Sequence, residues 1–241
     1  MLACPPPDAN LTENCANSIL GCYGRRCLVA NGEGKDSFGM VSYPRVKRIL
    51  DVLLGATAVA VCLPVLILAA VLVKLDSPGP VFFVQRRLGR NGGVFLLYKF
   101  RSMYFRAKPV EGQVVRGDPE VTRVGRVLRR LKIDELPQIW NVIKGDMSLV
   151  GPRPALPEQL AMLSGSALRR LDVRPGLTGL AQVKGNILLP WPQRWRYDVV
   201  YVQRLSMTLD AWIICRTLLV VLYGEEYFLR TSPRPLEAPP A

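Results

Sequence analysis

The sequence predicts a mainly helical α+β fold, with one membrane-inserted apolar helix followed by a compact domain. Three observations support this prediction: a long uncharged run, two short apolar stretches around a glycine-rich turn, and later segments whose apolar residues recur at helical spacing. The chain of 241 residues is long enough to bury a core of its own. Residues 1–39 are predicted to be unstructured or an over-called extension, with translation starting at or near Met40, and residues 231–241 to be a disordered tail.

The uncharged run covers residues 52–73. As a helix it would measure about 33 Å, which is enough to cross a bilayer. Pro64 near its middle predicts a kink or a break, and basic residues on both flanks favour keeping both ends on the cytoplasmic side. The residues alone therefore leave two arrangements open for 40–75, a re-entrant helical hairpin and a single span. They disfavour a third, the core helix of a soluble protein.

The domain after the membrane segment, 76–230, is predicted to begin with a β-hairpin. Residues 81–84 and 94–100 read as strands, and the glycines at 89–93 supply the turn between them. Residues 107–118 are polar and typical of a loop. Helices are expected after it, in the order 121–131 (basic), 134–142 (with Pro137 in its first turn), 158–171 (amphipathic), 195–204 (amphipathic) and 208–223 (apolar and suited to a membrane interface).

The composition limits the chemistry. The chain has no histidine, which excludes a Ser-His-Asp triad, a histidine general base and histidine-ligated zinc. Its 32 Lys and Arg residues against 19 Asp and Glu residues give a net charge of +13. Such a surplus favours an anionic partner, which can be nucleic acid, anionic lipid or a phosphorylated substrate. On composition alone, a basic surface that only aids solubility stays open as an alternative.

Asp134 and Glu135 are the first candidates for catalysis. Neighbouring helical residues point about 100° apart, so two adjacent carboxylates can face one site in different roles, one attacking and one binding a metal. Both stand at a predicted helix start, where the helix dipole favours anions. That position fits equally well two acids that do nothing more than stabilise the helix.

Cations flank this acidic pair in the sequence. Arg129 precedes it, and Arg153 follows it in a rigid Gly-Pro-Arg-Pro turn that fixes the direction of a guanidinium suited to phosphate. Arg174 stands before a proline in a similar context, and Lys99 and Arg101 would point to the same side of a strand. Each of these cations, taken singly, also fits an ordinary solvated surface charge.

Taken together, these features resemble the bacterial sugar transferases, which are monotopic phosphoglycosyl transferases. The similarity runs from about residue 44 to residue 222 in family order. It rests on the motifs KRILD at 47–51, SPGPVFF at 77–83, YKFRSM at 98–103, DELPQIWNV at 134–142, KGDMSLVGPRP at 144–154 and VRPGLTGLAQV at 173–183. So many linked motifs are not expected by chance.

The resemblance implies a Mg²⁺-dependent polyprenyl-phosphate sugar phosphotransferase at the cytoplasmic face of the bacterial inner membrane. Such an enzyme moves a sugar-1-phosphate from a UDP-sugar to undecaprenyl phosphate and releases UMP. This is the first membrane step of exopolysaccharide, capsule, O-antigen or glycoprotein glycan synthesis. Carboxylate nucleophiles and Mg²⁺ suit this chemistry, which needs no histidine.

The resemblance also implies roles for individual residues. Asp134 would be the nucleophile that forms a covalent phosphosugar intermediate, and Glu135 would be the second catalytic residue and the Mg²⁺ ligand. The substrate-binding residues would be Lys99, Arg101, Arg129, Arg153, Arg174 and Gln182, with Arg153 holding a phosphate. Pro64 would break a re-entrant membrane helix, which the resemblance favours over a span, although Leu63 stands where the family often has a serine.

Other functions fit the sequence less well. A nucleic-acid-binding protein suits the charge but not the 22-residue uncharged run, and no recognised nucleic-acid-binding motif is present. A non-catalytic membrane scaffold of a polysaccharide assembly complex is disfavoured by the joint presence of Asp134, Glu135 and Arg153. A membrane glycosyltransferase that moves sugar without phosphate would release UDP rather than UMP.

Overall fold

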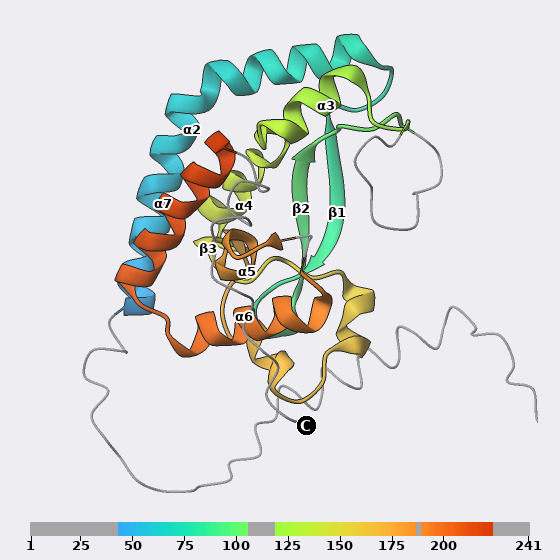
Figure 1. Cartoon of the computed structure of the whole chain (residues 1–241). Helices are drawn as coiled ribbons and strands as arrows, with labels where there is room; N and C mark the ends of the chain where they lie inside the picture. The colour runs from blue at the N-terminus through green and yellow to red at the C-terminus, as the bar shows by residue number, and fades with distance from the viewer. Residues whose placement is uncertain (1–42, 106–118, 187–188, 224–241) are drawn as a thin grey trace, which may run out of the picture. The chain divides into compact units, whose positions relative to one another are not determined.

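The computed structural model describes residues 43–105, 119–186 and 189–223, which all fall within the compact unit Gly39–Ala241. These residues form a mainly helical α+β fold with two small two-stranded sheets, as predicted (Figure 1). The predictions for 1–39, for the loop at 107–118 and for the tail at 231–241 lie outside the described residues.

The elements follow one another along the chain with short connections. In order they are α2 (Tyr43–Asp76), β1 (Phe82–Leu88), η1 (Arg90–Gly92), β2 (Val94–Phe100), α3 (Arg123–Arg130), η2 (Ile133–Glu135), α4 (Gln138–Lys144), β3 (Ser148–Val150), η3 (Pro157–Met162), η4 (Gly165–Leu171), β4 (Gly176–Thr178), α5 (Leu180–Val183), α6 (Trp191–Gln203) and α7 (Met207–Tyr223), where η marks a 3₁₀ helix.

Helix α2 is long and apolar enough to cross a membrane. The most apolar 18 residues of this helix have a mean hydropathy of 2.8, and 11% of that stretch is buried within the protein. The core helix of a soluble protein is mostly buried, whereas α2 exposes large apolar side chains such as Val61, Ile67 and Leu68. This exposure argues against the core-helix alternative, because apolar surface of this extent needs a nonaqueous surrounding.

Pro64 lies inside α2 without interrupting it. The proline ring removes one backbone hydrogen bond, which is a common cause of bending, and Figure 1 shows α2 changing direction part-way along its length. The helix is therefore bent but continuous across the residue that was expected to break it. The return of both ends to one face of the membrane stays a prediction.

Buried polar contacts fasten the first turns of α2 to the rest of the domain. The carboxylate of Asp210 on α7 accepts hydrogen bonds from the Tyr43 hydroxyl at 2.6 Å, from the Lys47 ammonium, and from the Tyr201 hydroxyl at 2.8 Å. One turn further along α2, Arg48 donates to the carbonyl oxygens of the last turn of α4. These contacts place the base of α2 against α4, α6 and α7.

The predicted β-hairpin is confirmed. Strands β1 and β2 pair antiparallel, with Phe83 opposite Lys99 and Arg87 opposite Phe95. Because directly opposed residues share one face of a sheet, Arg87 and Lys99 lie on the same face of the hairpin. A second, parallel pair joins β3 to β4, with Ser148 opposite Gly176.

The largest hydrophobic core lies where α5, α6 and α7 meet β3. It contains Val150, Leu180, Tyr197, Tyr201 and Ile213, among others. Burying an apolar side chain of this size contributes about 1.5–3 kcal/mol. A smaller cluster packs the C-terminal part of α2 against β2 and α3, through Ala69, Val73, Phe100 and Leu128.

Three of the expected helices are present, and two expectations are wrong in detail. Helices α3, α6 and α7 cover most of 121–131, 195–204 and 208–223. The segment 158–171 is not one amphipathic helix but the two 3₁₀ helices η3 and η4, because Leu163 and Ser164 are extended between them.

The expected helix 134–142 is also divided. Asp134 and Glu135 belong to the 3₁₀ turn η2, and α4 starts three residues later at Gln138. Pro137 occupies the N-cap position of α4, because it has no amide hydrogen to donate within a helix.

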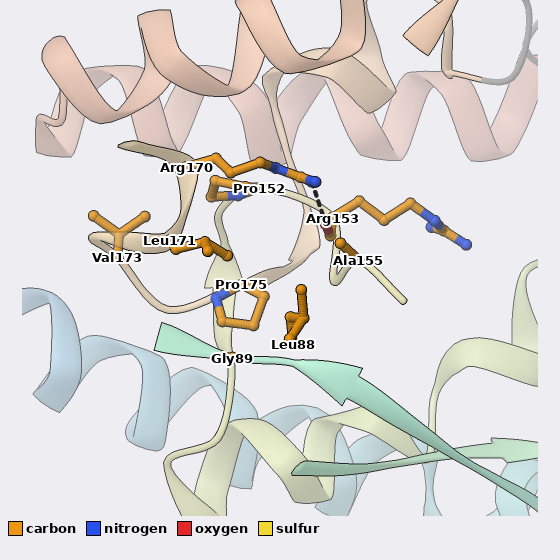
Figure 2. A pocket seen from close by; sticks show the side chains of 9 residues that line it. All are labelled: Leu88, Gly89, Pro152, Arg153, Ala155, Arg170, Leu171, Val173 and Pro175. Atoms are coloured by element: carbon orange, nitrogen blue, oxygen red, sulfur yellow. Dashed lines mark hydrogen bonds between the residues drawn. The ribbon is translucent and has the colours of Figure 1, made fainter. Parts of the chain in front are cut away.

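A buried ion pair joins η4 to α6. The Nη2 atom of Arg170 lies 2.9 Å from Oδ2 of Asp198, and the two side chains are 5% and 3% exposed. The same Nη2 atom donates to the carbonyl oxygen of Arg153 at 2.7 Å, the dashed line of Figure 2. Arg170 therefore connects α6 to the Gly-Pro-Arg-Pro turn that follows β3.

We predict that Arg170→Met lowers the free energy of unfolding by about 3–5 kcal/mol, because it leaves the Asp198 carboxylate buried without its counter-charge. The measurement is unfolding in detergent micelles. Arg169→Met, at the exposed neighbouring position, is the matched control and should change stability by less than about 0.5 kcal/mol. Equal losses in both variants would contradict the prediction.

Candidate active site

The acidic pair is placed by the way α3 ends. The hydroxyl oxygen of Thr122 caps α3 by accepting from the amide of Gly125 at 2.9 Å, and Gly125 lets the helix approach β2, since a Cβ there would lie 2.1 Å from the Ser102 carbonyl oxygen. After α3, Lys132 adopts a left-handed conformation with φ 57°. This residue reverses the chain direction and presents η2, with Asp134 and Glu135, to the end of β2.

Glu135 is held between two cations from different elements. Its Oε1 atom lies 2.8 Å from the Lys99 Nζ on β2 and 2.8 Å from Nη2 of Arg153. The Glu135 and Lys99 side chains are largely buried, at 15% and 19% exposed, while that of Arg153 is 42% exposed. The geometry thus joins three residues that are 18 or more positions apart in the sequence.

These cations decide the charge of Glu135. Burial alone would raise its pKa, but the charges and hydrogen bonds of Arg153 and Lys99 outweigh burial and hold the pKa of Glu135 well below its usual range. Glu135 is therefore a carboxylate at any physiological pH. Burial in turn lowers the pKa of Lys99, and the Glu135 charge opposes this shift.

Asp134 has a different environment from its neighbour. Its Oδ1 atom is buried and has no hydrogen-bond partner among the described residues. Burial, followed by the charge of Glu135, raises the pKa of Asp134, while the charges of Lys99, Arg129 and Lys132 act in the opposite direction. A buried carboxylate oxygen without a partner is costly and calls for an explanation, and nucleophilic reactivity supplies one.

Arg129 stands beside the acidic pair on α3. Its Nε donates to the Ser102 hydroxyl at 2.7 Å, and its charge is close enough to lower the pKa of Asp134. A shallow pocket lies on the other side of Arg153, lined by residues of the turns after β1, β3 and η4. Figure 2 shows the Arg153 guanidinium pointing away from the apolar side chains of this pocket.

The match to known proteins agrees with this geometry. A family model described as bacterial sugar transferase matches residues 42–224.

The chain belongs to this family. The family resemblance seen in the sequence motifs is thereby confirmed, and a non-enzymatic nucleic-acid-binding protein is disfavoured.

Several curated bacterial sugar transferases and related proteins are similar in sequence. "Uncharacterized sugar transferase EpsL" of Bacillus subtilis is 42% identical over 181 residues, which cover 75% of this chain and 89% of that protein. A UDP-glucose:undecaprenyl-phosphate glucose-1-phosphate transferase of Caulobacter vibrioides is 46% identical over 180 residues, 71% of this chain and 67% of that protein. Exopolysaccharide production protein ExoY of Rhizobium meliloti is 40% identical over 188 residues, 71% of this chain and 83% of that protein.

The structure of this bacterial sugar transferase brings together five of the site residues named from the sequence. They are Lys99, Arg129, Asp134, Glu135 and Arg153. The substrate contacts expected of these residues stay predictions, but their proximity to one another meets the first requirement of a common site.

Arg101 is committed elsewhere. Its guanidinium donates to the carbonyl oxygens of Ser77 and Pro78, each at 2.7 Å, and to the Ser77 hydroxyl at 2.9 Å, at the C-terminal end of α2. Strand β2 ends at Phe100, so the strand alternation that would have aligned Arg101 with Lys99 stops before Arg101. The structure thus gives this arginine a capping role and does not bring it to the acidic pair.

Arg174 and Gln182 also make their hydrogen bonds away from Glu135. The Nε of Arg174 donates to the carbonyl oxygen of Gly145 at 2.9 Å, at the end of α4. The Nε2 of Gln182 donates to the Leu177 carbonyl oxygen at 3.2 Å, on β4. The substrate-binding roles implied for these two residues stay predictions.

Two arginines near the site were missed from the sequence. The charges of Arg153 and Glu135 act on Arg87, and that of Arg153 acts on Arg194. Alternation along β1 would have identified Arg87, since Phe83, Gln85 and Arg87 share the face of Lys99. Arg194 carries no comparable signal, because its position depends on how α6 packs.

We predict that Lys99 and Glu135 are energetically coupled. Glu135→Gln leaves the Lys99 ammonium buried without its carboxylate, at a cost of about 3 kcal/mol. Combining Glu135→Gln with Lys99→Met removes both charges, so the double variant should lose less stability than the sum of the single losses, by more than about 0.5 kcal/mol. Free energies of unfolding in micelles give this coupling.

The control cycle uses Lys144→Met and Asp146→Asn. That pair lies 3.2 Å apart with a lysine side chain that is 54% exposed, so its coupling should stay below about 1 kcal/mol. Additive losses at Lys99 and Glu135 would contradict the predicted ion pair.

Proposed function

We propose that this chain transfers a sugar-1-phosphate from a UDP-sugar to undecaprenyl phosphate at the cytoplasmic face of the bacterial inner membrane. The observation that carries the proposal is the contrast within the acidic pair: Glu135 is clamped by two cations, while Asp134 holds a buried oxygen with no hydrogen-bond partner among the described residues. The Caulobacter relative, named as a glucose-1-phosphate transferase, supports the choice of reaction.

Asp134 is the nucleophile in this proposal. An Oδ atom of Asp134 forms a bond to the phosphorus that carries the sugar, and the bond from that phosphorus to the bridging oxygen of UMP breaks, so UMP leaves with the bridging oxygen. An oxygen of undecaprenyl phosphate then attacks the same phosphorus and displaces the Asp134 carboxylate. The product is undecaprenyl-diphosphate sugar, and the enzyme is restored.

The cations around the pair stabilise charge during both displacements. A phosphoryl group in transfer carries negative charge on its peripheral oxygens, and fixed cations in a partly buried site stabilise that charge without having to reorganise. Arg153 is suited to this task because its guanidinium is partly exposed while one of its nitrogens is held by Glu135. Lys99 and Arg129 add charge from β2 and α3.

The acidic pair fits a magnesium ion. Mg²⁺ is commonly held by one or two carboxylates together with substrate phosphates, and here two adjacent carboxylates are present, one with a buried oxygen that lacks a partner. Glu135 would hold the ion, which when bound would neutralise charge on the diphosphate. Among the described residues no group of three or more Cys, Asp or Glu side chains is present, so substrate oxygens would complete the coordination.

We predict that Asp134→Asn abolishes UMP release, because an amide cannot attack phosphorus. The measurement is nucleotide release from purified full-length protein supplied with undecaprenyl phosphate, Mg²⁺ and a panel of UDP-sugars. Asp146→Asn, which removes an acid of the partly exposed pair with Lys144, is the matched control and should retain turnover.

The released nucleotide distinguishes the proposal from its alternatives. Release of UMP with one sugar, lost in Asp134→Asn, identifies the donor together with the nucleophile. Release of UDP would mean that sugar moves without phosphate. A folded protein that releases neither nucleotide with any donor would favour a scaffold role.

We also predict an acid limb in the pH profile of kcat/KM that lies above the usual range of an aspartate. The reactive form of Asp134 is the carboxylate, and since burial and Glu135 raise its pKa, activity should fall as pH drops through that raised value. Lys132 lowers the pKa of Asp134, so Lys132→Gln should move the limb to higher pH. The limb should not move in Lys144→Gln, and an unmoved limb in Lys132→Gln would argue against Asp134 as the titrating group.

A further inference from the structure

Arg87 is held in a fixed orientation beside the Arg153 turn. Its Nη1 donates to the carbonyl oxygen of Pro154 at 3.1 Å, and its Nη2 donates to the Gln85 side-chain oxygen at 2.7 Å. Its Nε is buried and has no hydrogen-bond partner among the described residues. A guanidinium that is oriented on two sides and keeps an unused donor resembles a ligand-binding arginine more than a solvated one.

Arg194 reaches the same region from α6. It lies one helical turn before Asp198, so both residues lie on the same face of α6. Asp198 binds Arg170, and Arg170 donates to the Arg153 carbonyl oxygen. Arg194 itself donates to the Leu189 carbonyl oxygen at 2.7 Å, and its guanidinium carbon lies 4.5 Å from the centroid of the Trp191 ring.

The three arginines repel one another. Burial and the charge of Arg153 lower the pKa of Arg87 to about 10, and they also lower the pKa of Arg194. All three side chains stay charged at neutral pH, because an arginine deprotonates only well above it. Like charges gathered from β1, α6 and the turn after β3 are unfavourable in the empty protein, and an anion bound among them would relieve the repulsion.

We propose that Arg87 and Arg194 complete, with Arg153, a phosphate-binding site beside Glu135. The ligand is a phosphate or diphosphate group, and it rests on the proposed function that two substrates can supply it: the diphosphate of the UDP-sugar and the phosphate of the lipid acceptor. Guanidinium groups suit this ligand because they donate two parallel hydrogen bonds to phosphate oxygens. Arg86, on the opposite face of β1 and exposed, takes no part.

The first experiment is a calorimetric titration of the full-length protein in detergent with UDP. Arg87→Gln and Arg194→Gln should each weaken UDP binding by about 10- to 100-fold, the loss expected for a charge-assisted hydrogen bond. Arg86→Gln, which removes the same charge one position away, should leave the affinity unchanged. Thermal unfolding of each variant confirms that it is folded, and Arg194→Gln keeps the test valid if Arg87→Gln is unstable.

The second experiment measures KM for the UDP-sugar and for undecaprenyl phosphate with the same variants. Weaker UDP binding with a raised donor KM assigns the site to the donor diphosphate. Unchanged UDP binding with a raised KM for undecaprenyl phosphate assigns it to the lipid phosphate. Unchanged UDP affinity and unchanged KM for both substrates, or an equal loss in Arg86→Gln, would overturn the proposal.

The outcome also separates this inference from the proposed function. Wild-type protein that binds UDP in an Arg87-dependent way but releases no UMP would defeat the proposed reaction and leave the phosphate site standing. An active, UMP-releasing enzyme that is indifferent to Arg87→Gln and Arg194→Gln would defeat the phosphate site alone.

Discussion

The attachment of α2 to the domain through two buried carboxylates is the constraint on which the rest of the structure depends. Asp210 gathers Tyr43 and Lys47 from α2 and Tyr201 from α6. Tyr201 also donates to the Val150 carbonyl oxygen at 2.9 Å, at the end of β3 and three residues before Arg153. Buried charges must be paired, so the helix that meets the membrane, the core of α6 and α7, and the strand leading to the active site are positioned together.

Two adjacent carboxylates acquire different properties because their surroundings differ. Glu135 faces two cations that keep it ionised, whereas Asp134 is desolvated and feels the charge of Glu135. Pairs of acids whose pKa values are pushed apart by their environment are typical of sites that divide nucleophilic and electrostatic roles. The division here comes from the 3₁₀ turn η2, which directs neighbouring side chains to different partners.

Local patterns in the sequence predict the parts of the fold that depend on local interactions. The hairpin follows from two apolar stretches and a glycine turn, and Lys99, Asp134, Glu135 and Arg153 follow from motifs whose residues meet in space. The capping role of Arg101 and the division of 158–171 into two 3₁₀ helices do not follow, because the end of β2 and the extended Leu163 depend on tertiary packing. Arg194 escapes notice for the same reason.

The capping of α2 by Arg101 has a mechanical consequence. Arg101 binds the last carbonyl oxygens of α2 and stands two residues after Lys99, which contacts Glu135. No flexible linker separates the apolar helix from the strand that carries an active-site cation, so the depth of α2 in a lipid bilayer sets the height of the acidic pair above the headgroups. Bilayer thickness thereby becomes a variable that acts on the reach between the carboxylates and a lipid-borne phosphate.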